Sequence, residues 1–288
     1  MVGVIIVNYN QLNNCLYLFS ILQKEKIVSS VYCVDNSGEL LDFFEKNDNK
    51  FLKLEVINPG SNIGFGKANN LGVSKCKESR ILICNPDIYF MNGSIDKINT
   101  IYDDLAPNDL GFCFEMKDSN GEIQYSHRRL LQRNYFLINQ LGLSFILPDK
   151  YKLVYKNYIN LQSIDQPIGA FIFLDKKHFL SVGGFDDEFF VYYEDVYLFN
   201  KLNSKFNKMK YRNDISIYHK GGESSKKYFA KMLQLQIEGK KIYFKKMQWK
   251  NMSKFYLLVE YSLKIFFHRN QLKGSDFLHL FKQYFSKK

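Results

Sequence analysis

The first half of the chain alternates between short apolar runs and longer segments in which apolar residues recur with helical spacing. The short runs are rich in Val and Ile: 3-GVIIVNY-9, 30-SVYCVDN-36, 53-KLEVIN-58 and 80-RILICNPDI-88. Such runs are typical of strands buried on both faces of a parallel sheet. After the first run, a helix is predicted whose apolar face carries Leu12, Cys15, Leu16, Phe19 and Leu22. The alternation predicts βαβ units with right-handed crossovers, that is, an α/β fold.

Each predicted strand ends in a polar cluster. The clusters are Asn8-Tyr9-Asn10, Asp35-Asn36-Ser37, Asn58-Pro59-Gly60 and Asn85-Pro86-Asp87. In open α/β sheets, ligands bind just outside the carboxyl ends of the strands. The four clusters are therefore a candidate site, with Asp87 as one member. Taken alone, Asp87 could equally cap a helix that begins near Asn92-Gly93-Ser94, and Asp35 could be a turn residue.

The second half of the chain has a less regular pattern. Residues 111–165 contain strand-like pieces (GFCFEM, GEIQYS) within an aromatic-rich, loop-like portion. After it, 168-IGAFIFLD-175 predicts another buried strand. A Gly turn and an acidic, aromatic loop then lead into a helix that carries Val196, Leu198, Phe199 and Leu202. A final strand, 211–219, ends in His219.

Positive charge is concentrated at the end of the chain. The net charge of the 288 residues is +11, and residues 220–288 hold 16 Lys and Arg against four acidic residues. The remainder holds 24 basic and 25 acidic residues and is nearly neutral. This asymmetry predicts a domain over 1–222 and a basic, amphipathic helical extension over 223–288 that meets an anionic partner.

The sequence also limits the compartment in which the chain works. We expect no signal peptide, because the N-terminus lacks a basic region and a cleavage site, and no uncharged apolar run approaches the ~20 residues of a spanning helix. The five cysteines are scattered without CxxC spacing, which fits a reducing cytosol and does not fit a zinc site.

Single motifs in this sequence are ambiguous. Gly64 and Gly66 are spaced G-x-G but lack the third glycine of a dinucleotide fingerprint, so their loop could cradle a phosphate or form an ordinary turn. Glu194 and Asp195 could be an acidic pair favoured at a helix N-terminus. His219 could be a strand-end histidine without a role.

The ordered set of motifs is more specific than any one of them. The pieces VIIVNYN, VDNSG, NIGFGKANNLG, LICNPDI, GAFIFL, GGFDDEFFVYYEDVYL and YHKGGESS span roughly residues 2 to 225. In this order they resemble the family 2 glycosyltransferases, inverting enzymes of the GT-A fold that use nucleotide-sugar donors. The closest resemblance is to the rhamnosyltransferase-like branch of bacterial polysaccharide biosynthesis. This implies a Rossmann-like, mostly parallel central sheet flanked by helices.

The resemblance implies roles for individual residues. The donor would be bound at Val7, Asn8, Tyr9, Asp35, Asn36, Gly64, Gly66, Asn70, Asn85 and Asp87. Within this set, Asp35 would accept the imide N–H of uracil or thymine. Asp87 matches the last residue of the family's Asp-x-Asp motif and would hold Mg²⁺ or Mn²⁺ with His219. Asp195 would be the general base that deprotonates the acceptor hydroxyl, and Glu194 would orient the acceptor or tune that base. The acceptor would contact Gly169, Ala170, Phe185 and Glu194.

Two positions depart from the family's pattern. Asn85 stands where the first Asp of Asp-x-Asp would be, so that one carboxylate is offered to the cation, which would arrive together with the donor diphosphate. Tyr197 replaces an acid often found two residues after the base, which puts details of acceptor or metal contact in doubt. A nucleotidyltransferase is not favoured, because no Gly-rich triphosphate loop with Arg or Lys follows the first strand.

The resemblance and the basic tail together suggest partners. We expect a dTDP-rhamnose donor and a polyprenyl-diphosphate-linked glycan acceptor in O-antigen or capsule assembly, at the inner face of the plasma membrane. The basic extension, with Trp249 and several Phe, fits an anionic membrane surface. A solvated Lys-rich face packed on the catalytic domain and a homodimer contact stay open, and nucleic acid is not expected. The alternatives are another donor, such as a UDP-hexose or UDP-galactofuranose, or a nucleotide-sugar-binding protein without turnover.

Overall fold

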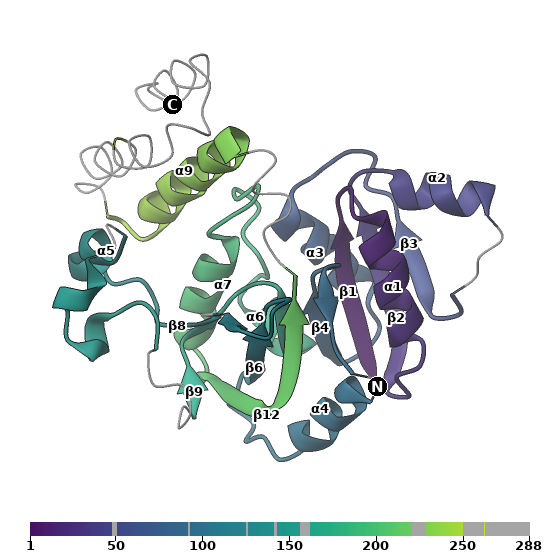
Figure 1. Cartoon of the computed structure of the whole chain (residues 1–288), viewed down its shortest axis with the longest axis horizontal. Coiled ribbons are helices and arrows are strands. Elements are labelled where there is room, and N and C mark those ends of the chain that lie inside the picture. The colour runs from purple at the N-terminus through teal and green to yellow at the C-terminus, as the bar shows by residue number, and fades with distance from the viewer. Residues whose placement is uncertain are drawn as a thin grey trace. The chain divides into compact units, whose positions relative to one another are not determined.

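The structure is a computed structural model of the whole chain (Figure 1). It describes residues 1–47, 51–91, 93–124, 126–140, 143–155, 162–220 and 229–249, together with Ser262. The chain forms two compact units. The first comprises 1–130, 154–187 and 195–221, and the second comprises 131–153, 188–194 and 222–288. The predicted boundary at residue 222 stays a prediction, because the second unit also takes two segments from the preceding sequence.

The strands agree with the apolar runs of the sequence. In the first half they are β1 (Val2–Asn8), β2 (Val28–Asp35), β3 (Leu54–Ile57), β4 (Arg80–Cys84) and β5 (Ile88–Tyr89). In the second half they are β6 (Gly111–Lys117), β7 (Ile123–Gln124), β8 (His127–Arg128), β9 (Ser163–Ile164), β10 (Gln166–Pro167), β11 (Phe171–Asp175) and β12 (Met209–His219). The run 80–88 contains β4 and β5, and β4 ends just before Asn85-Pro86-Asp87, the polar cluster at which the sequence predicts the end of this strand.

Helices connect these strands. The α-helices are α1 (Leu12–Leu22), α2 (Glu39–Lys46), α3 (Phe65–Lys75), α4 (Ser94–Tyr102), α5 (Arg133–Gln140), α6 (Lys176–Ser181), α7 (Glu194–Asn203) and α9 (Phe229–Lys246). Two short 3₁₀ turns, η1 (Ser144–Ile146) and η2 (Asp149–Tyr151), follow α5. The helices predicted at residues 11–26 and after Glu194 are both confirmed.

The central sheet has the strand order β3-β2-β1-β4-β11-β6-β12-β5. Strands β1 to β4 run parallel, and the chain passes from β1 to β2 on one side and back to β4 on the other. The carboxyl ends of β1 and β4 therefore flank the point where the strand order reverses, which is where open α/β sheets bind ligands. This is the mostly parallel, helix-flanked sheet that the sequence predicts.

Two later strands bring distant sequence to this edge. Strand β11 runs antiparallel to β4 with Phe171 opposite Cys84, so the residues just before β11 lie beside the carboxyl end of β4. Strand β12 runs antiparallel to β5 with His219 opposite Ile88. The segment 168–171 and His219 thus meet the Asn85-Pro86-Asp87 corner because of the strand pairing.

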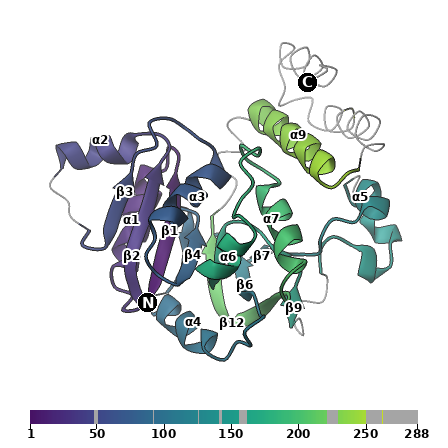
Figure 2. The same ribbon diagram turned by 180° about the vertical axis from the view of Figure 1, so that it is seen from behind.

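Both faces of the sheet are covered by apolar side chains. Helices α1 and α4 pack on one face, around Phe19, Leu22 and Ile98. Helices α3, α6 and α7 pack on the other, around Val73, Phe179 and Phe199, as Figure 2 shows from behind. The five cysteines are buried and free.

The start of α4 is capped by an acid from another part of the chain. The fully buried Glu25 accepts hydrogen bonds from the backbone N–H groups of Gly93, Ile95 and Asp96 at 2.6–3.1 Å. These are the donors that a helix N-terminus leaves without intrahelical partners. Glu25 thus caps this helix, a role for which the sequence also allowed Asp87.

The second unit has an aromatic centre. The ring centroids of Phe136 in α5 and Phe244 in α9 lie 5.1 Å apart. Phe244 also stacks on Trp249, with ring centroids 5.6 Å apart. Tyr243, Phe244 and Trp249 are buried here. Tyr228 and the apolar segment 255–267, apart from Ser262, lie outside the described residues. Across the ranges that the structure describes, no helix is long and apolar enough to cross a membrane.

Candidate active site

The ends of β1 and β2 are joined by a carboxylate whose two oxygens are both engaged. Asp35 Oδ1 accepts hydrogen bonds from Asn8 Nδ2 at 2.9 Å and from the N–H and Oγ of Ser37. Asp35 Oδ2 accepts from the N–H groups of Leu40 and Leu41 in the first turn of α2. Asp35 is 2% exposed. It therefore fixes the loop after β2, and its predicted contact with a nucleotide base stays a prediction.

The neighbouring loop before α3 is tied to the same corner. Asn36 Nδ2 donates to the carbonyl oxygen of Gly64 at 3.2 Å, and Gly64 has φ +87°, a backbone conformation that favours glycine. Gly66 is buried in α3, and Val7 is nearly buried at the end of β1. Tyr9 differs from these residues because it is 53% exposed. The structure thus brings the predicted residues of β1, β2 and α3 to one edge.

Asn70 links α3 to the Gly-Gly-Phe turn. Its Nδ2 donates to the carbonyl oxygen of Phe185 at 2.8 Å and to Asp187 Oδ1, and its Oδ1 accepts the N–H of Phe185 at 3.0 Å. Gly184 has φ +64°, and a Cβ there would lie 2.5 Å from Asn70 Oδ1. Asn70 is therefore engaged in holding this turn, and its expected contact with the donor stays a prediction.

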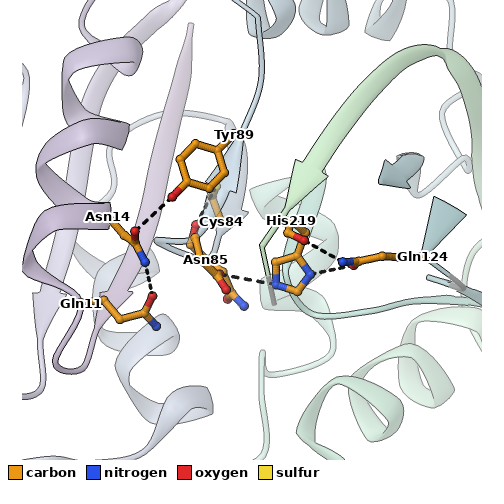
Figure 3. Close-up of polar contacts among 8 residues, drawn as sticks. Gln11, Asn14, Cys84, Asn85, Tyr89, Gln124 and His219 are labelled. Atoms are coloured by element: carbon orange, nitrogen blue, oxygen red, sulfur yellow. Dashed lines mark hydrogen bonds and ion pairs between the residues drawn. The ribbon is translucent and has the colours of Figure 1, made fainter. Parts of the chain in front are cut away.

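Asp87 and His219 form a pair where the end of β12 meets the corner before β5. His219 Nε2 lies 3.5 Å from Asp87 Oδ1, longer than a charge-assisted hydrogen bond. On the other side of the ring, His219 Nδ1 lies 2.9 Å from Gln124 Oε1, as Figure 3 shows. Both side chains of the pair are largely buried. The structure thus brings together the two residues that the resemblance assigns to the cation.

The segment before β11 connects this pair to the predicted base. The N–H of Asn85 donates to the carbonyl oxygen of Ala170 at 2.9 Å. The N–H of the adjacent Gly169 donates to Asp195 Oδ2 at 3.2 Å. A Cβ on Gly169 would lie in ordinary van der Waals contact with Asp195, 3.4 Å from its Cβ. One continuous set of backbone contacts therefore runs from the Asp87 corner to Asp195.

The environment of Asp195 is suited to a base. Burial raises the pKa of this carboxyl above its ordinary value, against the opposing effects of the Arg128 charge and of hydrogen bonds from the N–H groups of Val196 and Gly169. A carboxylate with a raised pKa binds a proton more strongly than an exposed one, which favours general base catalysis.

The turn that precedes Asp195 has an unusual backbone. Tyr192 and Tyr193 have φ +69° and +71°, a region that non-glycine residues occupy at a cost. Within the second unit, α9 packs on this turn. Gly239 lies so close to it that a Cβ would be 2.4 Å from the carbonyl oxygen of Tyr192. Glu194, which follows, is 5% exposed. The helix α9 thus supports the turn that leads into Asp195.

Two residues of this region were not found from the sequence. Gln124 and Arg128 lie in the short strands β7 and β8, within the stretch whose pattern was weakest. A two-residue strand is too short for alternation to reveal it. The strand-like piece GEIQYS was the one signal that pointed to this place.

The donor set at the Asp87 corner fits a divalent cation that arrives with a diphosphate. Within the described residues no three His, Cys, Asp or Glu side chains gather to hold a metal by themselves. Asp87 offers an oxygen and His219 a nitrogen, and the Oδ1 atom of Asn85 is buried without a hydrogen-bond partner. Mg²⁺ is often held by one or two carboxylates completed by substrate phosphates.

Two named proteins are similar to this chain in sequence. The low-salt glycan biosynthesis hexosyltransferase Agl10 of Haloferax volcanii is 24% identical over 211 residues, covering 67% of this chain and 59% of that protein. The rhamnosyltransferase WbbL of Escherichia coli K12 is 23% identical over 249 residues, covering 83% and 90%. No family model matches the chain.

Solved structures share the fold. TarS 1–349 of S. aureus, in complex with UDP-GlcNAc, has a TM-score of 0.53 and 18% identity, covering 83% of this chain and 66% of that one. The mannosyltransferase PcManGT of Pyrobaculum calidifontis, in complex with GDP-Man and Mn²⁺, also has a TM-score of 0.53, with 12% identity and 83% and 62% coverage. The chain therefore spans less than two thirds of these two structures and of the Haloferax relative.

The fold is the GT-A glycosyltransferase fold. In its ordered motifs the chain resembles the family 2 glycosyltransferases, and its similarity to a named hexosyltransferase and a named rhamnosyltransferase supports that resemblance.

Proposed function

We propose that this protein is an inverting glycosyltransferase that moves a sugar from a nucleotide donor to an acceptor hydroxyl. The observation that carries the proposal is the backbone connection from the Asp87–His219 pair, through Asn85, Ala170 and Gly169, to Asp195. In this proposal the donor diphosphate binds at one end of this connection, and the base with the raised pKa stands at the other. Inverting transfer needs these two elements on opposite sides of the reacting carbon.

The proposed reaction uses these residues as follows. Asp195 takes the proton of the acceptor hydroxyl, whose oxygen forms a bond to the anomeric carbon from the face opposite the nucleotide. The bond from that carbon to the diphosphate oxygen breaks, and the nucleoside diphosphate leaves. Asp87 and His219 would hold Mg²⁺ or Mn²⁺, which supplies positive charge to the leaving diphosphate. Gly169, Ala170, Phe185 and Glu194 would contact the acceptor.

For the donor we propose dTDP-L-rhamnose. The E. coli relative is named a rhamnosyltransferase, which supports this choice. UDP-hexose and UDP-galactofuranose are the alternatives, and the UDP-GlcNAc complex of TarS favours keeping UDP-linked donors in the test. Asp35 and Asn36, with Val7 to Tyr9, would bind the base, and Gly64, Gly66 and Asn70 would line the donor side.

For the acceptor we propose a polyprenyl-diphosphate-linked glycan at an anionic membrane, inside the cell. The second unit contains 18 Lys and Arg against seven Asp and Glu, and the first contains 22 of each. All of the chain's net positive charge thus belongs to the second unit, which supports a contact with anionic lipid. Tyr243, Phe244 and Trp249 are buried, so Phe145 and Ile146, which are 70% and 60% exposed, are better candidates for contact with lipid.

A transfer assay tests the enzymatic proposal. Purified protein would be given dTDP-rhamnose, UDP-glucose or UDP-galactofuranose with Mn²⁺ and a synthetic polyprenyl-diphosphate sugar acceptor. The proposal predicts product with one donor and none after chelation. Nucleotide binding without product, with every donor, would instead favour a nucleotide-sugar-binding protein that recruits partners.

The membrane proposal has its own test. Flotation with vesicles of phosphatidylglycerol and phosphatidylcholine should carry the protein upward, and vesicles of phosphatidylcholine alone should not. Phe145→Ser with Ile146→Ser should weaken binding, while the matched change of the exposed Leu52 in the first unit to Ser should not. Equal binding to both vesicle types would overturn the role of charge, and a concentration-dependent dimer lost in the double variant would point to a second copy of the chain.

A further inference from the structure

Gln124 contacts His219 through both ends of its side-chain amide. It lies in β7, which pairs with β6 opposite Met116, and β6 in turn pairs with β12, the strand that ends in His219. Gln124 Nε2 donates to the backbone carbonyl oxygen of His219 at 2.6 Å, and Gln124 Oε1 lies 2.9 Å from His219 Nδ1 (Figure 3). The amide thus bridges the backbone and the ring of one residue.

The backbone contact fixes which way the amide points. A carbonyl oxygen is an acceptor, so the atom of Gln124 that faces it must be the NH₂ group. The other atom of the amide, Oε1, is also an acceptor and faces Nδ1. Nδ1 must therefore carry a hydrogen. In a neutral imidazole with its hydrogen on Nδ1, the lone pair is on Nε2.

Nε2 is the ring atom that faces Asp87, 3.5 Å from its Oδ1. We infer that Gln124 is a positioning residue that holds His219 in the Nδ1–H tautomer and directs the Nε2 lone pair toward the place beside Asp87 where the cation would bind. Histidines that bind metals commonly donate their other ring N–H to a neighbouring oxygen in this way. Binding of a cation beside Asp87 rests on the proposed function, whereas the tautomer of His219 does not.

A purely structural role for Gln124 makes different predictions. In the alternative role, Gln124 only secures β7 to the end of β12 through its hydrogen bond to the carbonyl oxygen of His219. Two variants distinguish the two roles. Gln124→Glu keeps an oxygen to accept from Nδ1 but loses the donor to the carbonyl. Gln124→Met has similar length and offers neither. A support role is lost in both variants, and a tautomer role is lost in Gln124→Met alone.

The direct readout is the tautomer of His219 in the protein without ligand. Nitrogen NMR of protein labelled with ¹⁵N-histidine, at a pH where the ring is neutral, distinguishes a protonated ring nitrogen from a bare one. His219→Asn assigns the signal among the five histidines of the chain. The inference predicts Nδ1–H in the parent and in Gln124→Glu, and a shift toward Nε2–H in Gln124→Met. Nε2–H in the parent, or an unchanged tautomer in Gln124→Met, would overturn it.

A second readout connects the tautomer to the cation. Binding of Mn²⁺ in the presence of TDP or UDP, followed by electron paramagnetic resonance, should weaken about 10- to 100-fold in Gln124→Met and less in Gln124→Glu. Equal weakening in both variants would favour the support role. If the parent binds no Mn²⁺ with either nucleotide, the proposed function fails, and the NMR result still decides the role of Gln124.

Discussion

Two aspartates at the same edge of the sheet have opposite surroundings. Asp35, at the end of β2, accepts five hydrogen bonds, from Asn8, Ser37, Leu40 and Leu41. Asp195, at the start of α7, accepts two backbone N–H groups, and burial raises its pKa. Both follow a strand or begin a helix, and nothing in their sequence surroundings ranks them. The difference is in the number of donors that the folded chain directs at each carboxylate.

This difference separates a structural from a reactive carboxylate. A carboxylate with five donors stabilises the fold because its negative charge compensates several N–H groups at once. A carboxylate with few donors and little water is held in a state that favours accepting a proton. The same residue type thus contributes stability in one place and, in our proposal, chemistry in the other.

The largest effect is expected from Asp195→Asn. An amide cannot take the proton of the acceptor hydroxyl, so the transfer rate should fall by about 10²- to 10⁴-fold. Because burial raises the pKa of Asp195, the ionised carboxylate costs folding free energy at neutral pH, and the amide removes that cost. Stability should therefore be unchanged or slightly higher, as measured by urea unfolding. A variant with normal turnover would contradict the role of Asp195 as the base.

The converse is expected of Asp35→Asn. Its NH₂ group would face N–H donors where an oxygen stood, leaving buried donors without partners. The free energy of unfolding should fall by about 2–4 kcal/mol. The matched control is Asp42→Asn, at an exposed position of α2, which should change the free energy of unfolding by less than about 0.5 kcal/mol. An Asp35→Asn variant as stable as the parent would break the comparison.

Gly239→Ala tests whether α9 supports the turn that precedes Asp195. In an exposed helix interior this change stabilises by about 1 kcal/mol, because alanine has the higher helix propensity. Here the new Cβ would lie 2.4 Å from the carbonyl oxygen of Tyr192. We expect destabilisation of about 1–3 kcal/mol and a lower transfer rate, because the turn before Asp195 must shift.

The control for Gly239→Ala is Glu238→Ala. Glu238 is an exposed neighbour in α9 that hydrogen-bonds Gln234. Its loss should leave stability within about 0.5 kcal/mol and the rate unchanged. Stabilisation by Gly239→Ala would show that the turn is free to move, and α9 would then have no role in positioning it.

The smallest effect is a dependence of stability on pH at a third carboxylate. Burial acts to raise the pKa of Glu78, but hydrogen bonds from Ser29, Cys76 and backbone N–H groups lower it to about 2. The folded pKa is below the unfolded one, so this stability is present above about pH 4.5 and is lost as the pH falls toward 2.

At neutral pH Glu78 should contribute on the order of 1–2 kcal/mol, because solvent weakens the effect at a half-buried group. Glu78→Gln should remove it and flatten the stability profile between pH 4.5 and 2. Parallel profiles for parent and variant in urea unfolding would contradict the contribution.

Much of the fold was predictable because its signals are local. The Val- and Ile-rich runs predict β1 to β4, and the spacing of Leu12, Cys15 and Phe19 predicts α1. The polar cluster Asn85-Pro86-Asp87 predicts the end of β4, but the short β5 after it depends on pairing with β12, which no local pattern encodes.

The candidate site was predictable residue by residue but not in its contacts. The position of His219 beside Asp87 depends on antiparallel pairing of β12 with β5, more than 100 residues apart, which no local pattern encodes. For the same reason Gln124 could not be found. The donors that engage Asp35 and Asn70 come from loops whose conformation the sequence did not determine. Family resemblance assigned these two residues to the nucleotide. In the structure, Asp35 also fixes the loop after β2, and Asn70 also holds the turn at Phe185.

The central claim is that Asp87 and His219 hold a divalent cation together with a nucleoside diphosphate. Its most direct test is thermal stabilisation by TDP, UDP, GDP and ADP, each with and without Mn²⁺. A ligand that binds only the folded state raises its stability by about 2.7 kcal/mol at a hundredfold excess over Kd. The account predicts a metal-dependent rise with TDP or UDP that is lost in Asp87→Ala. No response to any nucleotide, or an equal rise in Asp87→Ala, would contradict it.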